Sequence, residues 1–258
     1  MAKFLKRIAR SEIDVAISEQ KGVRSLHLGG DMVQSAMRVD APNALELVYT
    51  QCMMGFLLFR PIPAHILMIG LGGGSLAKFV YHHLPQTKTT VIEINRQVIS
   101  TAFNYFALPK EDERLEIVHA DGAQYIAGHP LSTDILMIDG FDDGCQIASL
   151  CSRQLYDQAY QALCKDGVLV VNLLSRDKNL DTYIQRISDS FQGHIVAMLA
   201  DVRGNLIVFA FRHSPGKVSW KTLKTRAKKL EEIYGLPFSE FVFKLRKYND
   251  CYDKYLEL

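Results

Sequence analysis

The chain has 258 residues, of which 48% are hydrophobic and 22% charged, and its net charge at pH 7 is +2. This length suits one α/β domain with a small appendage, and the hydrophobic content is ordinary for a globular protein with a sizeable core. A charge this close to balance gives no argument for nucleic acid as a partner, and no apolar run approaches the ~20 residues of a membrane span. We therefore expect neither a nucleic-acid partner nor a membrane.

The cysteines and the N-terminal residues bear on the cellular compartment. Five cysteines, an odd number without a Cys-x-x-Cys pair, favour reduced thiols over a disulfide framework or a zinc site. The basic N-terminus MAKFLKRIARSEID lacks the apolar core and the cleavage site of a secretory signal. Both observations predict a cytoplasmic protein.

The first elements along the chain form a small unit ahead of the main domain. Residues 12–38 alternate apolar and polar side chains around the turn EQKG, which predicts an antiparallel β unit. Residues 43–59, NALELVYTQCMMGFLLF, are apolar on more than one face, which predicts a buried helix. We expect residues 1–42 to form a small N-terminal β unit.

After residue 64 the pattern changes to short apolar strands that alternate with helices. The expected strands are 65–70, 89–94, 115–120, 134–139, 167–174, 194–200 and 205–211, and the expected helices are 75–84, 95–106, 121–129, 152–164 and 180–191. Near-continuous apolar strands between helices indicate a mostly parallel sheet covered on both faces. Only DVRG separates the last two strands, which is short enough for an antiparallel hairpin. The expected fold class is α/β, a doubly wound Rossmann-like sheet over residues 43–213.

The remaining residues, 214–258, are predicted to be a helical extension. Residues 217–232, KVSWKTLKTRAKKLEE, are the strongest basic run. We interpret this run as a solvated amphipathic helix with Trp220, Leu223 and Leu230 turned inward. The alternative is a patch for RNA or an acidic partner, which a steep salt dependence of binding would support.

Ligands of an open α/β sheet bind beyond the carboxyl ends of its strands. The first strand of the sheet runs into Gly70, Gly72, Gly73 and Gly74, and glycines there permit positive φ and a close approach of a ligand to the backbone. A tight turn alone would explain the glycines. However, the next strand ends in Glu93, about 20 residues on, where a carboxylate can bind ribose hydroxyls. The pair predicts a site for adenosine or a similar nucleoside.

Acidic residues follow the next two strands. Asp121 precedes Gly122 and could accept a hydrogen bond from an exocyclic amine or cap the following helix, and the two roles are compatible. Asp139, Asp142 and Asp143 crowd the end of the fourth strand, where three carboxylates repel one another unless a cation is present. Because no histidine ligands accompany them, an organic amine is a better candidate than a metal ion. A solvated acidic turn is the alternative.

The order of these motifs, from the glycine loop through VIEI and VHADG to MIDGFD, resembles the polyamine aminopropyltransferases, the spermidine synthase family. The resemblance extends over residues 12–212. It implies a seven-stranded, class I methyltransferase-type Rossmann sheet behind a small β domain, and a homo-oligomer, commonly a dimer. It also implies that an aminopropyl group passes from decarboxylated S-adenosylmethionine to a small di- or polyamine, without a metal.

On the cofactor side, the resemblance implies that the glycine loop faces the aminopropyl–sulfonium end, Glu93 binds ribose, and Asp121 with Gly122 binds adenine. The segment LHLGGDMVQSAM resembles the part of the family that carries a ligand-contacting Gln, which places Gln34 there.

On the acceptor side, the segment LELVYTQCMMGFLLF resembles the family helix with a substrate-contacting Tyr, which places Tyr49 there. Asp139 would be the catalytic base, and Asp142, with Asp143 beside it, would help to hold the amine. Amines with a pKa near 10 arrive protonated at pH 7, so a carboxylate must hold the nucleophile and accept its proton.

One departure from the family concerns the cofactor. The family motif G-G-G-D-G-G has an Asp that contacts the amino group of the decarboxylated cofactor, and Gly73 stands in its place. Methyl transfer from ordinary S-adenosylmethionine and non-catalytic nucleoside binding therefore stay open. The fourth strand lacks the [DN]-P-P-[YF] signature of amino methyltransferases, and retention of Asp139 and Asp142 speaks against a loss of activity.

Overall fold

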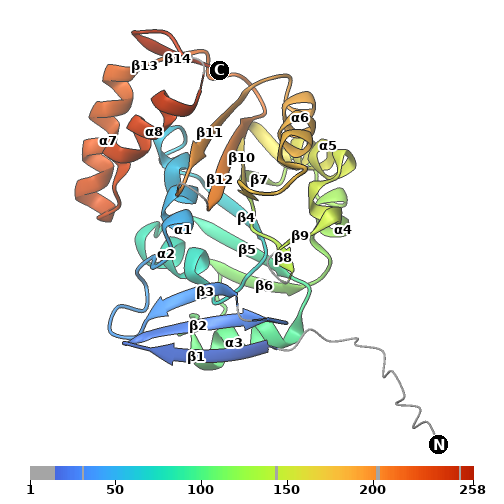
Figure 1. Ribbon diagram of the computed structural model, residues 1–258. Helices are drawn as coiled ribbons and strands as arrows, with labels where there is room; N and C mark the ends of the chain where they lie inside the picture. The colour runs from blue at the N-terminus through green and yellow to red at the C-terminus, as the bar shows by residue number, and fades with distance from the viewer. Residues whose placement is uncertain (1–14, 31, 143–144, 202–203, 250) are drawn as a thin grey trace, which may run out of the picture.

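The structure of the protein is a computed structural model, which describes residues 15–30, 32–142, 145–201, 204–249 and 251–258. At its centre is a seven-stranded sheet with the order β11-β12-β10-β7-β4-β5-β6 (Figure 1). Its strands are β4 (His65–Ile69), β5 (Lys88–Glu93), β6 (Leu115–His119), β7 (Thr133–Ile138), β10 (Leu163–Leu174), β11 (Ile195–Leu199) and β12 (Asn205–Phe211). Only β12 runs antiparallel to its neighbours, β10 and β11. The predicted fold class and the closing hairpin are confirmed.

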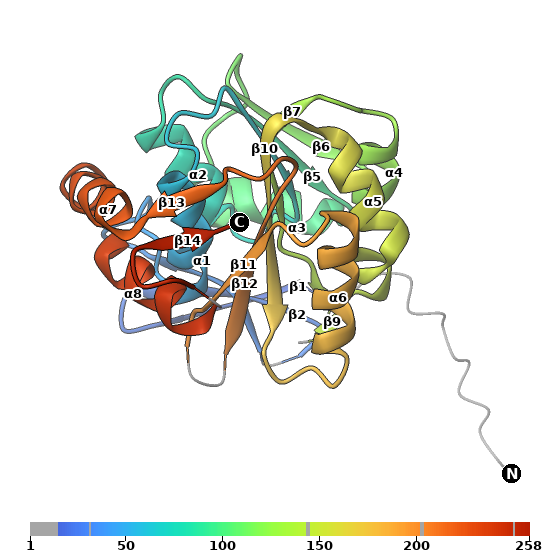
Figure 2. The same cartoon turned by 90° about the horizontal axis from the view of Figure 1, so that it is seen from above.

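Both faces of the sheet are covered by helices, as the view from above shows (Figure 2). Alternate residues of one strand enter different cores: in β4, Met68 packs into one hydrophobic cluster, and Leu67 and Ile69 pack into the other. One cluster includes residues of α4 (Gly122–Ala127), α5 (Arg153–Ala162) and α6 (Leu180–Ser190). The opposite cluster includes residues of α2 (Ser75–His83), α3 (Arg96–Tyr105), α7 (Trp220–Tyr234) and α8 (Phe238–Tyr248). This two-sided burial is why the strands read as continuous apolar runs.

The N-terminal unit is an antiparallel sheet of β1 (Val15–Gln20), β2 (Val23–Leu28) and β3 (Val33–Arg38), in that order. It lies beside α3 in Figure 1. Arg24 of β2 joins the two elements, since its Nη1 donates to the carbonyl oxygen of Tyr105 at 2.5 Å. The predicted β unit is confirmed over its described part, and residues 12–14 and 31 of that prediction lie outside the described residues.

The predicted helix over residues 43–59 is wrong in its bounds. The α-helix α1 spans only Val48–Met53 and continues as the 3₁₀ helix η1 (Met54–Leu58). Upstream, local polar contacts compete with helix formation: Glu46 pairs with Arg38 of β3, and the Gln51 side chain donates to the carbonyl oxygen of Leu45 at 2.7 Å.

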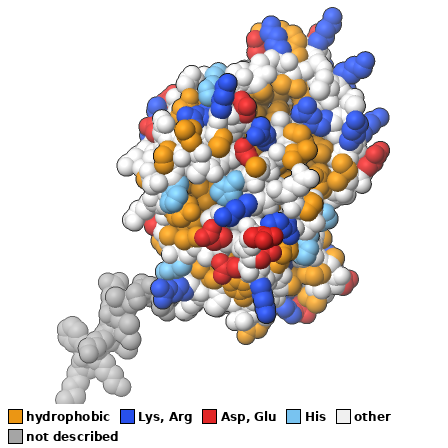
Figure 3. Space-filling view, turned by 180° about the vertical axis from the view of Figure 1, so that it is seen from behind, with side chains coloured by type: hydrophobic (Ala, Val, Ile, Leu, Met, Phe, Trp, Pro, Cys, Tyr) orange, Lys and Arg blue, Asp and Glu red, His pale blue; other side chains and the backbone are white. Residues whose placement is uncertain are grey.

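The C-terminal extension is not entirely helical. Residues predicted as the start of a helix form β13 (Lys217–Ser219), which pairs antiparallel with β14 (Tyr255–Glu257). The helix α7 follows, and it buries Trp220, Leu223 and Leu230 as predicted. Lys and Arg side chains on the face seen in Figure 3 lie among acidic and apolar ones and do not form one continuous basic patch. No helix in the described parts of the chain is both long and apolar enough to cross a membrane.

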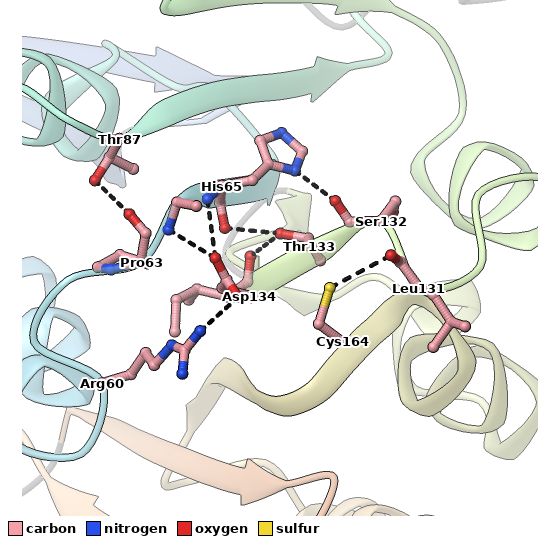
Figure 4. A network of polar contacts seen from close by, with 11 residues as sticks. Arg60, Pro63, His65, Thr87, Leu131, Ser132, Thr133, Asp134 and Cys164 are labelled. Carbon is pink, nitrogen blue, oxygen red and sulfur yellow. Dashed lines mark hydrogen bonds and ion pairs between the residues drawn. The ribbon is translucent and has the colours of Figure 1, made fainter.

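A polar network holds β4 and β7 together at the amino ends of these strands (Figure 4). Asp134, 7% exposed, accepts hydrogen bonds from the backbone N–H groups of Ala64 at 2.6 Å and His65 at 3.1 Å. Its other oxygen pairs with Arg60 Nη2 at 2.9 Å. The network gives the buried carboxylate of Asp134 its hydrogen-bond partners. It lies at the opposite end of the sheet from the expected ligand site, which is at the carboxyl ends of the strands.

Candidate functional site

A cavity of about 270 Å³ lies at the carboxyl ends of β4, β5 and β7. The chain proceeds from β4 outward to β5 and β6 and then returns to β7 on the other side of β4. The cavity is therefore at the point where the strand order reverses, the expected ligand position of such sheets. The predicted residues that line it are Gln34, Tyr49, Gly70, Gly72, Glu93, Asp121, Gly122 and Asp139.

The glycine loop divides into a part that faces the cavity and a part that does not. Gly70 has φ +97°, and a Cβ there would stand 2.2 Å from the carbonyl oxygen of Asp139. Gly70 therefore lets the ends of β4 and β7 approach each other, and with Gly72 it presents backbone to the cavity.

Gly73 and Gly74 are outside the cavity lining. A Cβ at Gly73 would lie 2.8 Å from both Phe106 Cδ1 and Ser35 Oγ, and one at Gly74 would lie 2.7 Å from Leu108 Cδ1. Close packing against the segment after α3 therefore accounts for these two glycines. Their roles as cofactor contacts stay predictions.

Glu93, at the end of β5, is 9% exposed and lines the cavity. One carboxylate oxygen accepts from the N–H of Leu71 at 2.9 Å, and the other accepts from the N–H of Asn95 at 2.8 Å. Burial raises the pKa of Glu93, and hydrogen bonds from the backbone N–H groups of Leu71, Asn95 and Ile94 oppose that rise. A carboxylate has about four acceptor sites, so Glu93 retains capacity for a further hydrogen bond, such as one from a ribose hydroxyl.

Asp121 caps α4, because its Oδ1 accepts from the backbone N–H of Gln124 at 2.9 Å. The capping alternative is thus confirmed, and Asp121 also lines the cavity. Gly122 brings α4 close to β4, since a Cβ there would meet Ile69 Cγ2 at 2.4 Å. Binding of adenine by Asp121 is compatible with the cap and stays a prediction.

Asp139, which follows β7, has two side-chain partners at the cavity wall. Asn172 Nδ2 donates to Oδ1 at 2.8 Å, and the Tyr49 hydroxyl donates to Oδ2 at 3.2 Å. Burial raises the pKa of Asp139 to about 6, and the two hydrogen bonds act in the opposite direction. Burial and the neighbouring Asp139 raise the pKa of Tyr49 well above its ordinary value, so Tyr49 stays a neutral donor. At neutral pH the site therefore presents a carboxylate that can take up a proton near pH 6.

The predicted acidic cluster also includes Asp142 and Asp143. The backbone of Asp142 belongs to β8 (Phe141–Asp142), which pairs antiparallel with β9 (Cys145–Gln146). Asp143 lies outside the described residues. The roles of both residues in holding an amine stay predictions. In the described part of the chain, no three His, Cys, Asp or Glu side chains lie together so that they could hold a metal ion.

Sequence reasoning missed several polar residues of this region, among them Ser35, Ser75 and Asn172. Ser35 and Ser75 line the cavity and lie 3.4 Å apart, hydroxyl to hydroxyl. Asn172 is 2% exposed and contacts Asp139. The signal for Asn172 was present in the strand GVLVVNLL, where it is the one polar side chain in an apolar run.

Comparison with known proteins gives the family. The model of the spermine/spermidine synthase domain matches residues 46–198. The chain belongs to the spermine/spermidine synthase family. The polyamine aminopropyltransferase of Chromobacterium violaceum is 44% identical to it over 237 residues, 92% of this chain and 90% of that protein. The polyamine aminopropyltransferase of Neisseria meningitidis serogroup A is 42% identical over 246 residues, 95% of this chain and 94% of that protein.

Solved structures agree with this spermine/spermidine synthase fold. A probable spermidine synthase from Corynebacterium glutamicum has a TM-score of 0.72 over 95% of each chain, at 16% identity, a likeness of fold alone. Human methyltransferase-like protein 13, solved in complex with SAH, has a TM-score of 0.60 at 26% identity, over 80% of this chain and 93% of the other. The family identification agrees with the resemblance found in the sequence.

Proposed function

We propose that this spermine/spermidine synthase family member transfers an aminopropyl group from decarboxylated S-adenosylmethionine to a small di- or polyamine. The relatives that are 44% and 42% identical over most of both chains are named polyamine aminopropyltransferases. The observation that carries the proposal for this chain is Asp139, a carboxylate at the cavity wall with a pKa of about 6. A base with this pKa is ionised at neutral pH and can accept a proton from a bound ammonium group.

The residues of the cavity fit an adenosyl sulfonium. Glu93 retains acceptor capacity for a ribose hydroxyl, and Asp121 can accept from the adenine amine. Gly70 and Gly72 offer bare backbone beside the tail. When bound, the sulfonium makes its adjacent carbon electrophilic. Gln34 lines the cavity from β3, and we assign it to the cofactor.

The residues on the other side would prepare the acceptor. An amine with a pKa near 10 enters as a cation, and the anionic Asp139 attracts it and removes its proton. Tyr49 donates to the same carboxylate and holds it against the cavity wall. Holding the amine in line with the electrophilic carbon supplies much of the rate. Asp142 and Asp143 are proposed to help to hold the amine.

The test is to incubate the protein with decarboxylated S-adenosylmethionine and a mixture of di- and polyamines, and to follow methylthioadenosine by mass spectrometry. We expect release that depends on added amine, together with an acceptor whose mass grows by one aminopropyl group. If methylthioadenosine is bound by the protein and yet never released from the cofactor with any amine, the proposal is wrong.

Methyl transfer is the second candidate. Its support is Gly73, which stands in place of the Asp of the family's glycine motif. Phe106 and Ser35 fill the space that a side chain at Gly73 would need. The 26% identical methyltransferase structure points the same way. Ordinary S-adenosylmethionine in the same assay distinguishes the two, since methyl transfer releases S-adenosylhomocysteine.

The predicted homo-oligomer is proposed as well, and analytical ultracentrifugation of the purified chain tests it.

A further inference from the structure

Asn172 is a buried polar residue inside an apolar strand. It lies in β10 between Val171 and Leu173, which are both buried in the core that packs against α5 and α6. The side chain of Asn172 itself is 2% exposed. A buried amide is costly unless its donor and acceptor groups have partners, so its hydrogen bonds reveal what it does.

Its partners form a chain across three strands. Asn205 Nδ2, at the start of β12, donates to Asn172 Oδ1 at 2.9 Å. Asn172 Nδ2 then donates to Asp139 Oδ1, beyond the end of β7, at 2.8 Å. The antiparallel strand makes this contact available, because β12 runs beside β10 and places Asn205 opposite Leu174, two residues from Asn172.

The direction of these hydrogen bonds matters. An amide has a donor end and an acceptor end, whereas a carboxylate only accepts. If the Asn172 amide were turned over, its Oδ1 would face the carboxylate of Asp139 and its Nδ2 would face the Nδ2 of Asn205. The acceptor-only carboxylate of Asp139 and the donation by Asn205 therefore favour the same orientation, in which Asn172 donates to Asp139.

We propose that Asn172 and Asn205 are a positioning pair that orients Asp139 and favours its ionised form for the transfer reaction. This inference rests on the proposed function as far as the reaction is concerned. The titratable groups of the described residues that line the same cavity are Tyr49, Glu93 and Asp121, and of these Tyr49 contacts Asp139. A hydrogen bond to the charged form lowers the pKa of a carboxyl group, so loss of the Asn172 donor raises it.

Two single variants and their double variant test the pair through the pH profile of kcat/KM. In Asn172→Leu the acidic limb is expected to move to higher pH by about one unit, with activity largely restored at high pH. Asn205→Ala is expected to move it in the same direction by less. Because Asn205 acts through Asn172, the double variant should match Asn172→Leu alone.

A matched control is Asn249→Ala. Asn249 also fixes a strand of this sheet through its side chain, with Oδ1 accepting from the N–H of Ala197 at 2.7 Å and Nδ2 donating to the carbonyl oxygen of Ala197 at 2.7 Å. It has no part in the cavity lining. Its loss is expected to lower stability without moving the pH profile.

A second readout does not depend on turnover. The pKa of Asp139 can be followed by NMR in protein labelled with ¹³C at the aspartate carboxyl carbons, with Asp139→Asn to assign the signal. A rise of this pKa in Asn172→Leu supports the pair even if no amine is ever a substrate, in which case the proposed function alone fails. An unchanged Asp139 pKa and an equal loss of activity at every pH would overturn the inference. If Asn172→Leu does not fold, Asn205→Ala decides: no shift in its Asp139 titration overturns the pair.

Discussion

Replacement of Asp139 by Asn has opposite expected effects on activity and stability. At pH 7 a carboxyl group with a pKa of about 6 is about nine-tenths ionised and available as a base. The Asn side chain cannot accept a proton from an ammonium group. We therefore expect Asp139→Asn to lose about 10²- to 10⁴-fold in kcat, the usual contribution of a positioned general base. Methylthioadenosine, which does not need the base, should bind as before.

The stability effect follows from the same pKa. Burial raises the pKa of Asp139 from 3.8 to about 6, so the ionised carboxylate destabilises the folded state by about 3 kcal/mol. This penalty is absent below pH 3.8, grows as pH rises from 3.8 to about 6, where only the unfolded state has lost the proton, and is fully present above pH 6. Asn removes the charge at nearly constant volume, and its amide can still contact Asn172 and Tyr49. The variant should therefore be more stable at neutral pH and no more stable at low pH.

The assay is thermal unfolding of both proteins between pH 4 and pH 8. At about 2 °C per kcal/mol for a chain of this size, the melting temperature of Asp139→Asn should exceed that of the wild type by about 6 °C at pH 8. The difference should fall toward zero at pH 4. A difference that is the same at both pH values would refute the raised pKa, and wild-type turnover in the variant would refute the role of Asp139 as a base.

Three further substitutions address other parts of the molecule. Glu93→Ala should weaken methylthioadenosine binding about 10- to 100-fold in isothermal titration calorimetry, because the ribose loses a charged acceptor; unchanged affinity would remove Glu93 from the site. Asp134→Ala should lower the free energy of unfolding by about 3 kcal/mol in urea titrations, since Arg60 and two backbone N–H groups lose a buried partner, while nucleoside affinity is retained. Gly73→Ala should cost about 1–3 kcal/mol of stability, because the new Cβ would stand 2.8 Å from Phe106 and from Ser35; a variant as stable as the wild type would show that the loop has room at this position.

Much of the fold was accessible from the sequence because its signals are local. Each strand of the parallel sheet is an apolar run that ends at a polar residue, and all such ends meet at one edge of the sheet. That rule alone brought Gly70, Glu93, Asp121 and Asp139 to a single cavity, where the structure also has them. The helix before β4 was misjudged because the apolar run over residues 43–59 cannot distinguish an α-helix from a 3₁₀ segment or from an irregular buried stretch.

The sequence by itself determined the sheet, the position of the site and the acidic residue at its centre. The tertiary structure alone decided which residues act on that acid. Asn172 and Asn205 are 33 positions apart and 33 or more from Asp139, and they meet only because an antiparallel strand inserts beside β10. It also decided that Gly73 and Gly74 pack against Phe106 and Leu108 and do not line the cavity. The physical reason is the same in both cases: hydrogen bonds and close packing depend on which distant atoms become neighbours, and no local pattern of residues contains that information.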